Sequence, residues 1–105
     1  MTQSSLTPAV FHILLALADG PLHGYAVMQA VEESSGVAMG PGTVYGTLER
    51  LESSGLVREV PTARTDRRRV FALQPAGRTA LQDEAARLSR LAGLVRAKKL
   101  VPRES

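Results

Sequence analysis

Cysteine and tryptophan are absent from this sequence of 105 residues, and only 4% of the residues are aromatic. Without cysteine the chain can form neither a disulfide framework nor a thiolate metal site, and a reducing cytoplasm is its simplest setting. The longest apolar run, residues 13–18, is far too short to span a bilayer, so we expect no membrane partner. Residues 1–5 place no positive charge before an apolar run, so we expect no signal peptide.

Groups that carry catalytic or metal chemistry are also scarce. The two histidines, His12 and His23, lie apart in the sequence, and no partner stands at metal-ligand spacing from His12. His12 lies among apolar residues, which favours a structural role, and His23 precedes a helix, which favours a role in a turn or a cap. Because there is no glycine-rich phosphate loop and no cluster of acids, we expect no enzyme, no metal and no cofactor.

The chain is long enough for one domain with a small core, which dimerisation would help to stabilise. An apolar fraction of 44% is ordinary for a globular protein. The formal net charge is +3 and the isoelectric point is near 10.0, so the chain is mildly basic. A solvated surface of no special function would give the same totals, so the position of the charges decides what they indicate.

One stretch, residues 40–57, has the features of a short helix with clear ends. Gly40 and Pro41 stand before it and Gly55 stands where a left-handed cap is expected, which predicts a helix over residues 41–54. Its apolar residues form one core-facing stripe: Val44, Leu48 and Leu51. Its opposite side is small and polar, with two more residues on the flank: Thr43, Gly46, Arg50 and Ser53, then Tyr45 and Glu49. A helix this narrow on its outer face suits a DNA major groove.

The segments around this helix complete a pattern. Thr7 and Pro8 open a first helix as cap and first residue, and a second helix is expected over about residues 24–33. After the central helix, strands are expected over residues 56–60 and 68–73, joined by a polar turn. The tip of this hairpin carries four of the 13 basic residues against one acid: Arg64, Arg67, Arg68 and Arg69 against Asp66. A solvated loop is the alternative, but the position directly after the groove helix favours phosphate contact.

A last helix is expected from residue 75 to about residue 98. One apolar side repeats along it, interrupted by Glu84: Leu81, Leu88, Leu91 and Val95. This helix either folds back on its own core or pairs with a second copy of the chain. We favour pairing, because the helices and hairpin before it already complete a core. Residues 99–105 are expected to be a disordered tail.

The predicted order of elements is that of a mainly α (α+β) winged helix-turn-helix. We place the DNA-binding domain at residues 1–75, with the dimerisation helix, residues 76–98, continuous with it. Four segments in this order resemble the PadR family of transcriptional regulators: residues 17–25, 42–45, 48–51 with 55–57, and 71–78. The resemblance covers about residues 6–90 and is to the compact members with a single dimerisation helix.

This resemblance implies a homodimer that binds double-stranded operator DNA, usually as a repressor, and is often released by a small phenolic or drug-like effector. It implies DNA-contacting residues on the central helix and on the wing: Gly42, Thr43, Tyr45, Gly46 and Arg50, then Arg64, Arg67 and Arg68. The only hydrophobic surface for an effector is a dimer cleft lined by the first helix and the apolar side of the last: Leu81, Leu88, Leu91 and Val95. Family members that sandwich a flat ligand use a tryptophan, which this chain lacks, and Gln74 replaces the threonine that commonly caps their last helix.

Each residue of the central helix also has an alternative role. Thr43 either binds a phosphate or caps the helix. Tyr45 either donates its hydroxyl to a phosphate or packs its ring beside the first helix. Gly46 allows close approach of DNA or of another helix. Arg50 either contacts a base edge or phosphate or forms an ion pair with Glu49 or Glu52. The alternative function is a winged-helix protein-interaction module without DNA binding, against which the basic wing argues.

Overall fold

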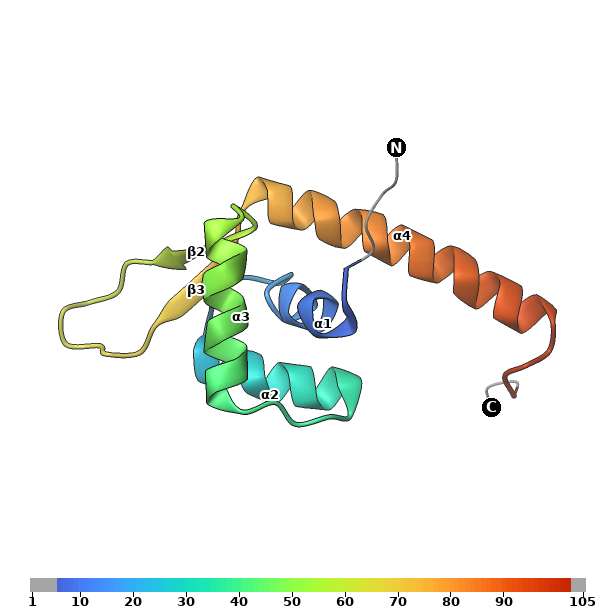
Figure 1. Cartoon of the computed structure of the whole chain (residues 1–105), viewed down its shortest axis with the longest axis horizontal. Coiled ribbons are helices and arrows are strands. Elements are labelled where there is room, and N and C mark those ends of the chain that lie inside the picture. The colour runs from blue at the N-terminus through green and yellow to red at the C-terminus, as the bar shows by residue number, and fades with distance from the viewer. Residues whose placement is uncertain (1–5, 103–105) are drawn as a thin grey trace.

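The computed structural model describes residues 6–102 and shows three helices, a small antiparallel sheet and a long last helix (Figure 1). The elements in chain order are α1 (Pro8–Ala16), β1 (Leu22–His23), α2 (Gly24–Ser35), α3 (Pro41–Ser53), β2 (Val57–Val60), β3 (Val70–Leu73) and α4 (Pro75–Ala97). The predicted mainly helical winged helix-turn-helix is therefore confirmed. Within the described part of the chain, no helix is long and apolar enough to cross a membrane.

The ends of α1 and α3 follow their predicted caps. The hydroxyl of Thr7 accepts a hydrogen bond from the backbone of Val10 (3.2 Å), and Pro8 is the first residue of α1. At the end of α3, Gly55 has a φ of 80°, and Leu56 N donates to Leu51 O over 2.9 Å. This Schellman arrangement ends the helix and directs the chain into β2.

The sheet differs from the prediction in one strand and in its bounds. β1 pairs with β3 through Leu22 and Phe71, which gives the order β1-β3-β2. Its two residues are too few to show an alternating pattern, so the sequence did not predict this strand. β3 begins at Val70 and not at Arg68, because the backbone N–H of Arg68 donates to the carboxylate of Asp66 (3.0 Å). α2 continues to Ser35 and ends at Gly36, whose φ is 76°.

The core gathers side chains from all the helices and from the hairpin. The predicted stripe of α3 is buried, with Val44 and Leu48 at 0% and Leu51 at 7% exposure. Around it pack further fully buried side chains from α1, α2, β2 and β3: Ile13, Leu14, Val27, Val31, Val57 and Phe71. His12 Nδ1 lies 2.6 Å from Ser34 Oγ, so this histidine links α1 to α2 in the expected structural role.

The long helix α4 has two different halves. Its first half packs on the body: Leu81 is 5% exposed, and Arg78 donates to Ala18 O over 2.8 Å. At Gly77 a Cβ atom would collide with Leu56 O, so only glycine allows this close packing. Its second half runs beyond the body (Figure 1), and Leu88 and Leu91 are 37% and 40% exposed.

The first half of α4 therefore folds back on its own core, and pairing with a second copy stays a prediction for the exposed second half. Leu81, which the sequence assigned to the dimer interface, is covered by its own protomer and has little surface left for a second copy. Of the tail predicted to be disordered, residues 103–105 lie outside the described residues. The backbone of Lys99 and Leu100 still donates back to Arg96 O and Val95 O.

Candidate nucleic-acid interface

The outer face of α3 (Thr43, Gly46, Arg50 and Ser53) lies opposite the buried stripe, as predicted, and is open to solvent around its ends. The cap of α3 is Gly40, without a side-chain hydrogen bond, so the alternative role of Thr43 as the cap is wrong. Gly42 and Thr43 are instead exposed residues of the first turn. Backbone N–H groups in a first turn have no intrahelical acceptor and favour an anion.

Gly46 opens the middle of this face. A Cβ atom built there would meet only Arg50 Nη1, at an ordinary 3.8 Å. No other helix within residues 6–102 therefore comes close enough to require a glycine, and that alternative fails inside one chain. Glycine at mid-helix costs about 1 kcal/mol relative to alanine, and nothing packed against it in the protomer offsets this cost.

Arg50 is exposed and held at one edge. Its Nη2 donates to the hydroxyl of Thr47 over 3.1 Å, and Thr47 is itself 3% exposed. The ion pair predicted as the alternative does not form: Glu49 binds Arg69, and Glu52 accepts from the backbone of Glu59. A guanidinium has five N–H donors, so this contact orients Arg50 and leaves donors for a ligand.

Tyr45 packs at a junction between elements and is half-buried. Its ring lies so close to Gly24 at the start of α2 that a Cβ atom there would overlap it. It also meets Phe71 edge-on, with ring centroids 6.2 Å apart. The ring is therefore packed inside the protomer, and the contacts described here are with α2 and the sheet.

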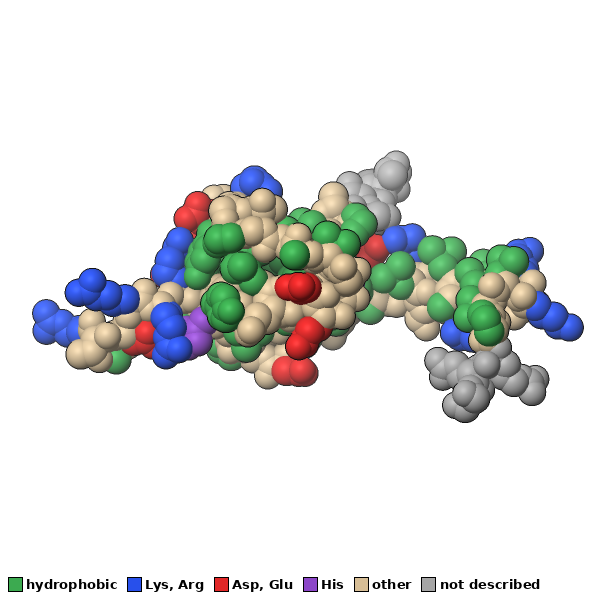
Figure 2. All heavy atoms as spheres, turned by 90° about the horizontal axis from the view of Figure 1, so that it is seen from below, with side chains coloured by type: hydrophobic (Ala, Val, Ile, Leu, Met, Phe, Trp, Pro, Cys, Tyr) green, Lys and Arg blue, Asp and Glu red, His purple; other side chains and the backbone are tan. Residues whose placement is uncertain are grey.

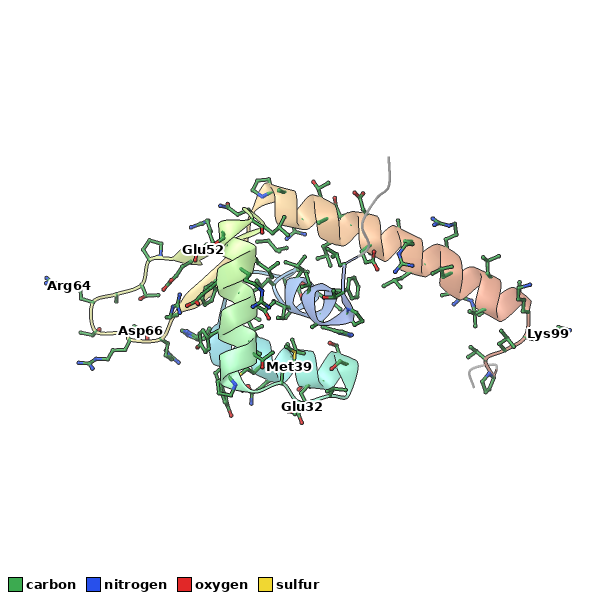
Figure 3. All side chains as sticks on the ribbon, in the orientation of Figure 1. Glu32, Met39, Glu52, Arg64, Asp66 and Lys99 are labelled. Atoms are coloured by element: carbon green, nitrogen blue, oxygen red, sulfur yellow. The ribbon has the colours of Figure 1, made fainter. Side chains whose placement is uncertain are left out.

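The wing formed by β2, β3 and the loop between them projects away from the body, with Arg64 at its tip (Figures 1 and 3). Arg64 and Arg67 are exposed and, within residues 6–102, have no carboxylate within ion-pair distance. Arg68 Nε binds Asp66 Oδ1 over 3.1 Å, and these hydrogen bonds hold the pKa of Asp66 below its usual value. Basic side chains gather at this end of the molecule (Figure 2), and Arg58 of β2 is a third exposed arginine of the wing without an ion pair in the described chain.

Arg69, the fourth arginine of the hairpin, points into the molecule. Nη1 donates to Glu49 of α3 over 3.0 Å, and Nη2 donates to Glu59 of β2 over 2.9 Å. The guanidinium lies 5.7 Å from the ring centroid of Tyr45 and 5.1 Å from that of Phe71. These pairs raise the pKa of Arg69 above its already high value and lower the pKa of Glu59.

Sequence reasoning missed the special position of Arg69, although one feature indicates it. Residues two apart on a strand share a face, so Arg69 continues the face of the buried Phe71. Arg68 belongs to the opposite face and remains 67% exposed.

A helix pair whose second helix shows a narrow polar face, beside an arginine-tipped hairpin, defines a winged helix-turn-helix DNA-binding protein. Residues 13–83 match the Transcriptional regulator PadR-like family. The chain belongs to this family, which confirms the predicted resemblance, and the family is one of DNA-binding transcriptional regulators and not of enzymes.

Two relatives are similar in sequence. Over 82 residues the chain is 42% identical to the transcriptional regulator Rv3488 of Mycobacterium tuberculosis (strain ATCC 25618 / H37Rv), covering 77% of this chain and 76% of that protein. Over 83 residues it is 53% identical to an uncharacterized 37.1 kDa protein in transposon TN4556 of Streptomyces fradiae, covering 79% of this chain. The chain spans only 24% of the length of that Streptomyces protein.

Solved structures support the fold. A PadR family transcription regulator from Clostridium difficile R20291 superposes with a TM-score of 0.76 at 20% identity, over 87% of this chain and 97% of that one. Bacillus subtilis PadR in complex with operator DNA superposes with a TM-score of 0.62 at 23% identity, over 70% of this chain and 44% of that one.

Proposed function

We propose that this chain is a homodimeric repressor that reads operator DNA with the outer face of α3. One observation carries the proposal: Gly46 and Arg50 form an open, narrow face beside the unpaired arginines of the wing. A B-DNA major groove is about 12 Å wide and admits a helix. The face is free of bulky aliphatic side chains, so the backbone of α3 can approach the base edges closely.

The residues of α3 divide into base and phosphate contacts. Arg50 makes the base-edge contact, because a bidentate pair with guanine is the commonest specific contact of an arginine. Gly42 and Thr43 receive a phosphate at the first turn of α3, where the N–H groups and the helix dipole favour negative charge. Tyr45 contacts DNA only through the exposed part of its side chain, because its ring packs against Gly24 and Phe71.

The wing supplies affinity without sequence information. Arg64 and Arg67 contact phosphates, and Arg68 adds less because Asp66 compensates its charge. Sequence preference then comes from Arg50, from the backbone fit at Gly42 and Gly46, and from DNA shape.

A second copy covers the bare half of α4 (residues 88–97). Leu88, Leu91 and Leu94 are 37%, 40% and 53% exposed there, and burying such side chains drives association. Val95 continues this apolar stripe towards the end of α4. Leu81 lies at its other end and is buried within its own protomer. A two-fold axis through this interface places two α3 helices on two half-sites of a palindromic operator, with residues 1–75 as the DNA-binding part.

A small hydrophobic effector fits the cleft between the paired α4 helices and α1. The apolar side chains exposed on α4 and Leu15 of α1, which is 41% exposed, support this site. Because the chain lacks tryptophan, the ligand is held by aliphatic contacts and not between indole rings. Acting on chromosomal DNA places the protein in the cytoplasm.

The test is to sequence DNA fragments captured by the purified protein from genomic and random pools, with and without phenolic ligands. We expect an enriched palindromic motif that overlaps a promoter, and less transcription from that promoter in a reconstituted assay. An Arg50→Ala variant is the matched control and should lose the motif. No enrichment, and no shift of the protein's own promoter fragment, would favour the protein-interaction module.

A further inference from the structure

Arg69 joins the wing to α3 by both hydrogen bonds and ring contacts. Its guanidinium binds Glu49 on α3 and Glu59 on β2, and it lies over the rings of Tyr45 and Phe71. Its carbonyl oxygen also accepts from Gly24 N at the start of α2, over 3.1 Å. We name this group of Arg69, Glu49, Glu59 and the two rings the Arg69 junction.

The charges of this junction argue against a direct DNA contact. Two carboxylates already accept from the guanidinium at 2.9–3.2 Å, which occupies three of its five N–H donors and compensates its charge. A phosphate brought to the same place would meet the carboxylates of Glu49 and Glu59. Arg64 and Arg67 on the same hairpin have no such partners in the described chain and suit phosphates better.

The place of the junction in the fold indicates what it does. β2 and β3 have four residues each, and the loop between them projects far from the core (Figure 1). A second link, from Glu59 N to Glu52 of α3 over 3.1 Å, joins the same two elements nearby (Figure 3). The outer face of α3 and the arginines of the wing must engage one duplex together, so the angle between these elements sets which contacts form at once.

We propose that Arg69 is a positioning residue: it fixes the wing relative to α3 so that base contacts and wing contacts form on the same DNA, and it does not touch DNA itself. The inference rests on the proposed function, because it assigns a role in operator recognition. A change at Arg69 should therefore lower the preference for the operator over random DNA, whereas removal of a charge that contacts phosphate should weaken binding to both.

Substitution by lysine separates geometry from charge. Arg69→Lys keeps the positive charge but cannot bridge two carboxylates with a planar fork while stacking on rings. The matched control is Arg67→Lys, which makes the same change at an exposed residue of the same hairpin. Both variants are compared with wild type on the captured operator and on random DNA, over a salt series, after thermal unfolding shows that each is folded.

We expect Arg69→Lys to lower the operator-to-random affinity ratio by roughly threefold to thirtyfold, the size usual for residues that couple two sites. The salt slope should not change, because no charge is lost. Amide hydrogen exchange should quicken in β2 and β3 and stay unchanged in α1. Arg67→Lys should match wild type in all three measurements.

Glu59→Gln keeps the test decisive if Arg69→Lys unfolds. This variant frees Arg69 from β2 and adds net positive charge, so binding to random DNA should rise while operator preference falls. If Glu59→Gln raised the affinity for operator and random DNA equally, or if a folded Arg69→Lys kept the wild-type preference, the inference would fail while the proposed function would stand. Equal weakening on both DNAs by Arg69→Lys would make Arg69 a phosphate contact. A wild type without sequence preference would instead remove the proposed function, and this inference with it.

Discussion

The outer face of α3 and the bare half of α4 are both open surfaces, but they differ in chemistry. The face of α3 shows a glycine, two hydroxyls and an oriented arginine, and it lies beside the unpaired Arg64 and Arg67 of the wing. The bare half of α4 shows leucines that are 37–53% exposed. A polyanion suits the first surface, and an apolar surface of equal extent, such as a second copy, suits the second.

The two surfaces also differ in how firmly the protomer holds them. α3 buries its whole apolar stripe, so its outer face is rigid before any ligand arrives. The last turns of α4 run beyond the body (Figure 1), and only the proposed second copy would give them tertiary contacts. Changes on α3 should therefore alter DNA binding with little effect on assembly, and changes on α4 should do the reverse.

The largest expected effect comes from charge in the bare half of α4. Leu88→Asp should weaken dimerisation by at least about 3 kcal/mol. Each of the two protomers loses a buried leucine from the interface and brings a desolvated carboxylate into it. Analytical sedimentation measures the mass, and Ser89→Asp on the neighbouring exposed position is the control. Dimers that persist for Leu88→Asp would remove this helix half from the interface.

The docked half of α4 supplies the contrast to that experiment. Leu81→Ala should lower the free energy of unfolding by about 2–4 kcal/mol, because the side chain is 5% exposed within its own protomer. Leu88→Ala should leave monomer unfolding almost unchanged. Denaturant titration of both variants, at a protein concentration low enough for wild type to be monomeric, compares the two halves without dimerisation.

On α3, removal of one arginine should weaken specific binding. Arg50→Ala should cost about 1–3 kcal/mol on the operator and much less on random DNA, because a base contact carries the discrimination. Ser53→Ala, three residues later on the same face of α3, is the control. Equal losses on both DNAs in a fluorescence titration would make Arg50 a phosphate contact.

Gly46→Ala should change folding and binding in opposite directions. Alanine gains about 1 kcal/mol of helix propensity, and its Cβ meets only Arg50 Nη1 at 3.8 Å, so the protein should become more stable. The same methyl group should weaken operator binding if the backbone of α3 approaches DNA here. Thermal unfolding and a gel shift measure the pair, and unchanged DNA affinity would show that this part of α3 stays away from the groove.

The arginines of the wing should affect salt dependence more than specificity. Arg64→Ala with Arg67→Ala should lower the slope of log affinity against log salt by about 2, since each phosphate contact contributes roughly 0.9. Arg68→Ala alone should change it less, because Asp66 already pairs with Arg68. Arg90→Ala with Arg96→Ala on α4 removes the same two charges and controls for net charge. An unchanged slope in the double variant of the wing would remove the wing from DNA.

Much of the α3 surface could be predicted from the sequence, because residues three or four apart in a helix lie on the same side. Val44 and Leu48 identify the buried side, and Gly55 marks the end, so the outer face follows from local sequence. The fate of Leu81 and Leu88 could not be predicted in this way. They share one side of the same helix, and only the position of α1 and β3 in space decides which one is covered.

The division of the wing arginines had the same limit. Arg68 and Arg69 are adjacent in the sequence, but only Arg69 lies over the ring of Phe71, while Arg68 binds Asp66 in the loop. The partners of Arg69 come from α3 and β2, which are distant in the chain. A charge count over the hairpin therefore overstated the charge available to DNA.

The smallest effect we expect lies at the boundary between the two halves of α4, where Glu84 is 7% exposed and bonded to Arg87. This pair holds the pKa of Glu84 below its usual value of 4.5 in the folded chain. A lowered folded-state pKa means that the pair stabilises the fold above pH 4.5, and that this contribution is lost as the pH falls below that value. Wild type should therefore unfold at a higher temperature than Glu84→Gln at neutral pH, and the gap should close on acidification.

Comparison with Glu84→Gln isolates this group, because the other acids with lowered pKa values, Glu59 and Asp66, are present in both proteins and cancel. Glu33→Gln, at an exposed position of α2, is the control, and its unfolding temperature should follow that of wild type across the pH series. A gap that stays constant down to pH 3 would mean that Glu84 stabilises α4 by packing and not by its charge. The boundary between the docked and bare halves would then depend on shape alone.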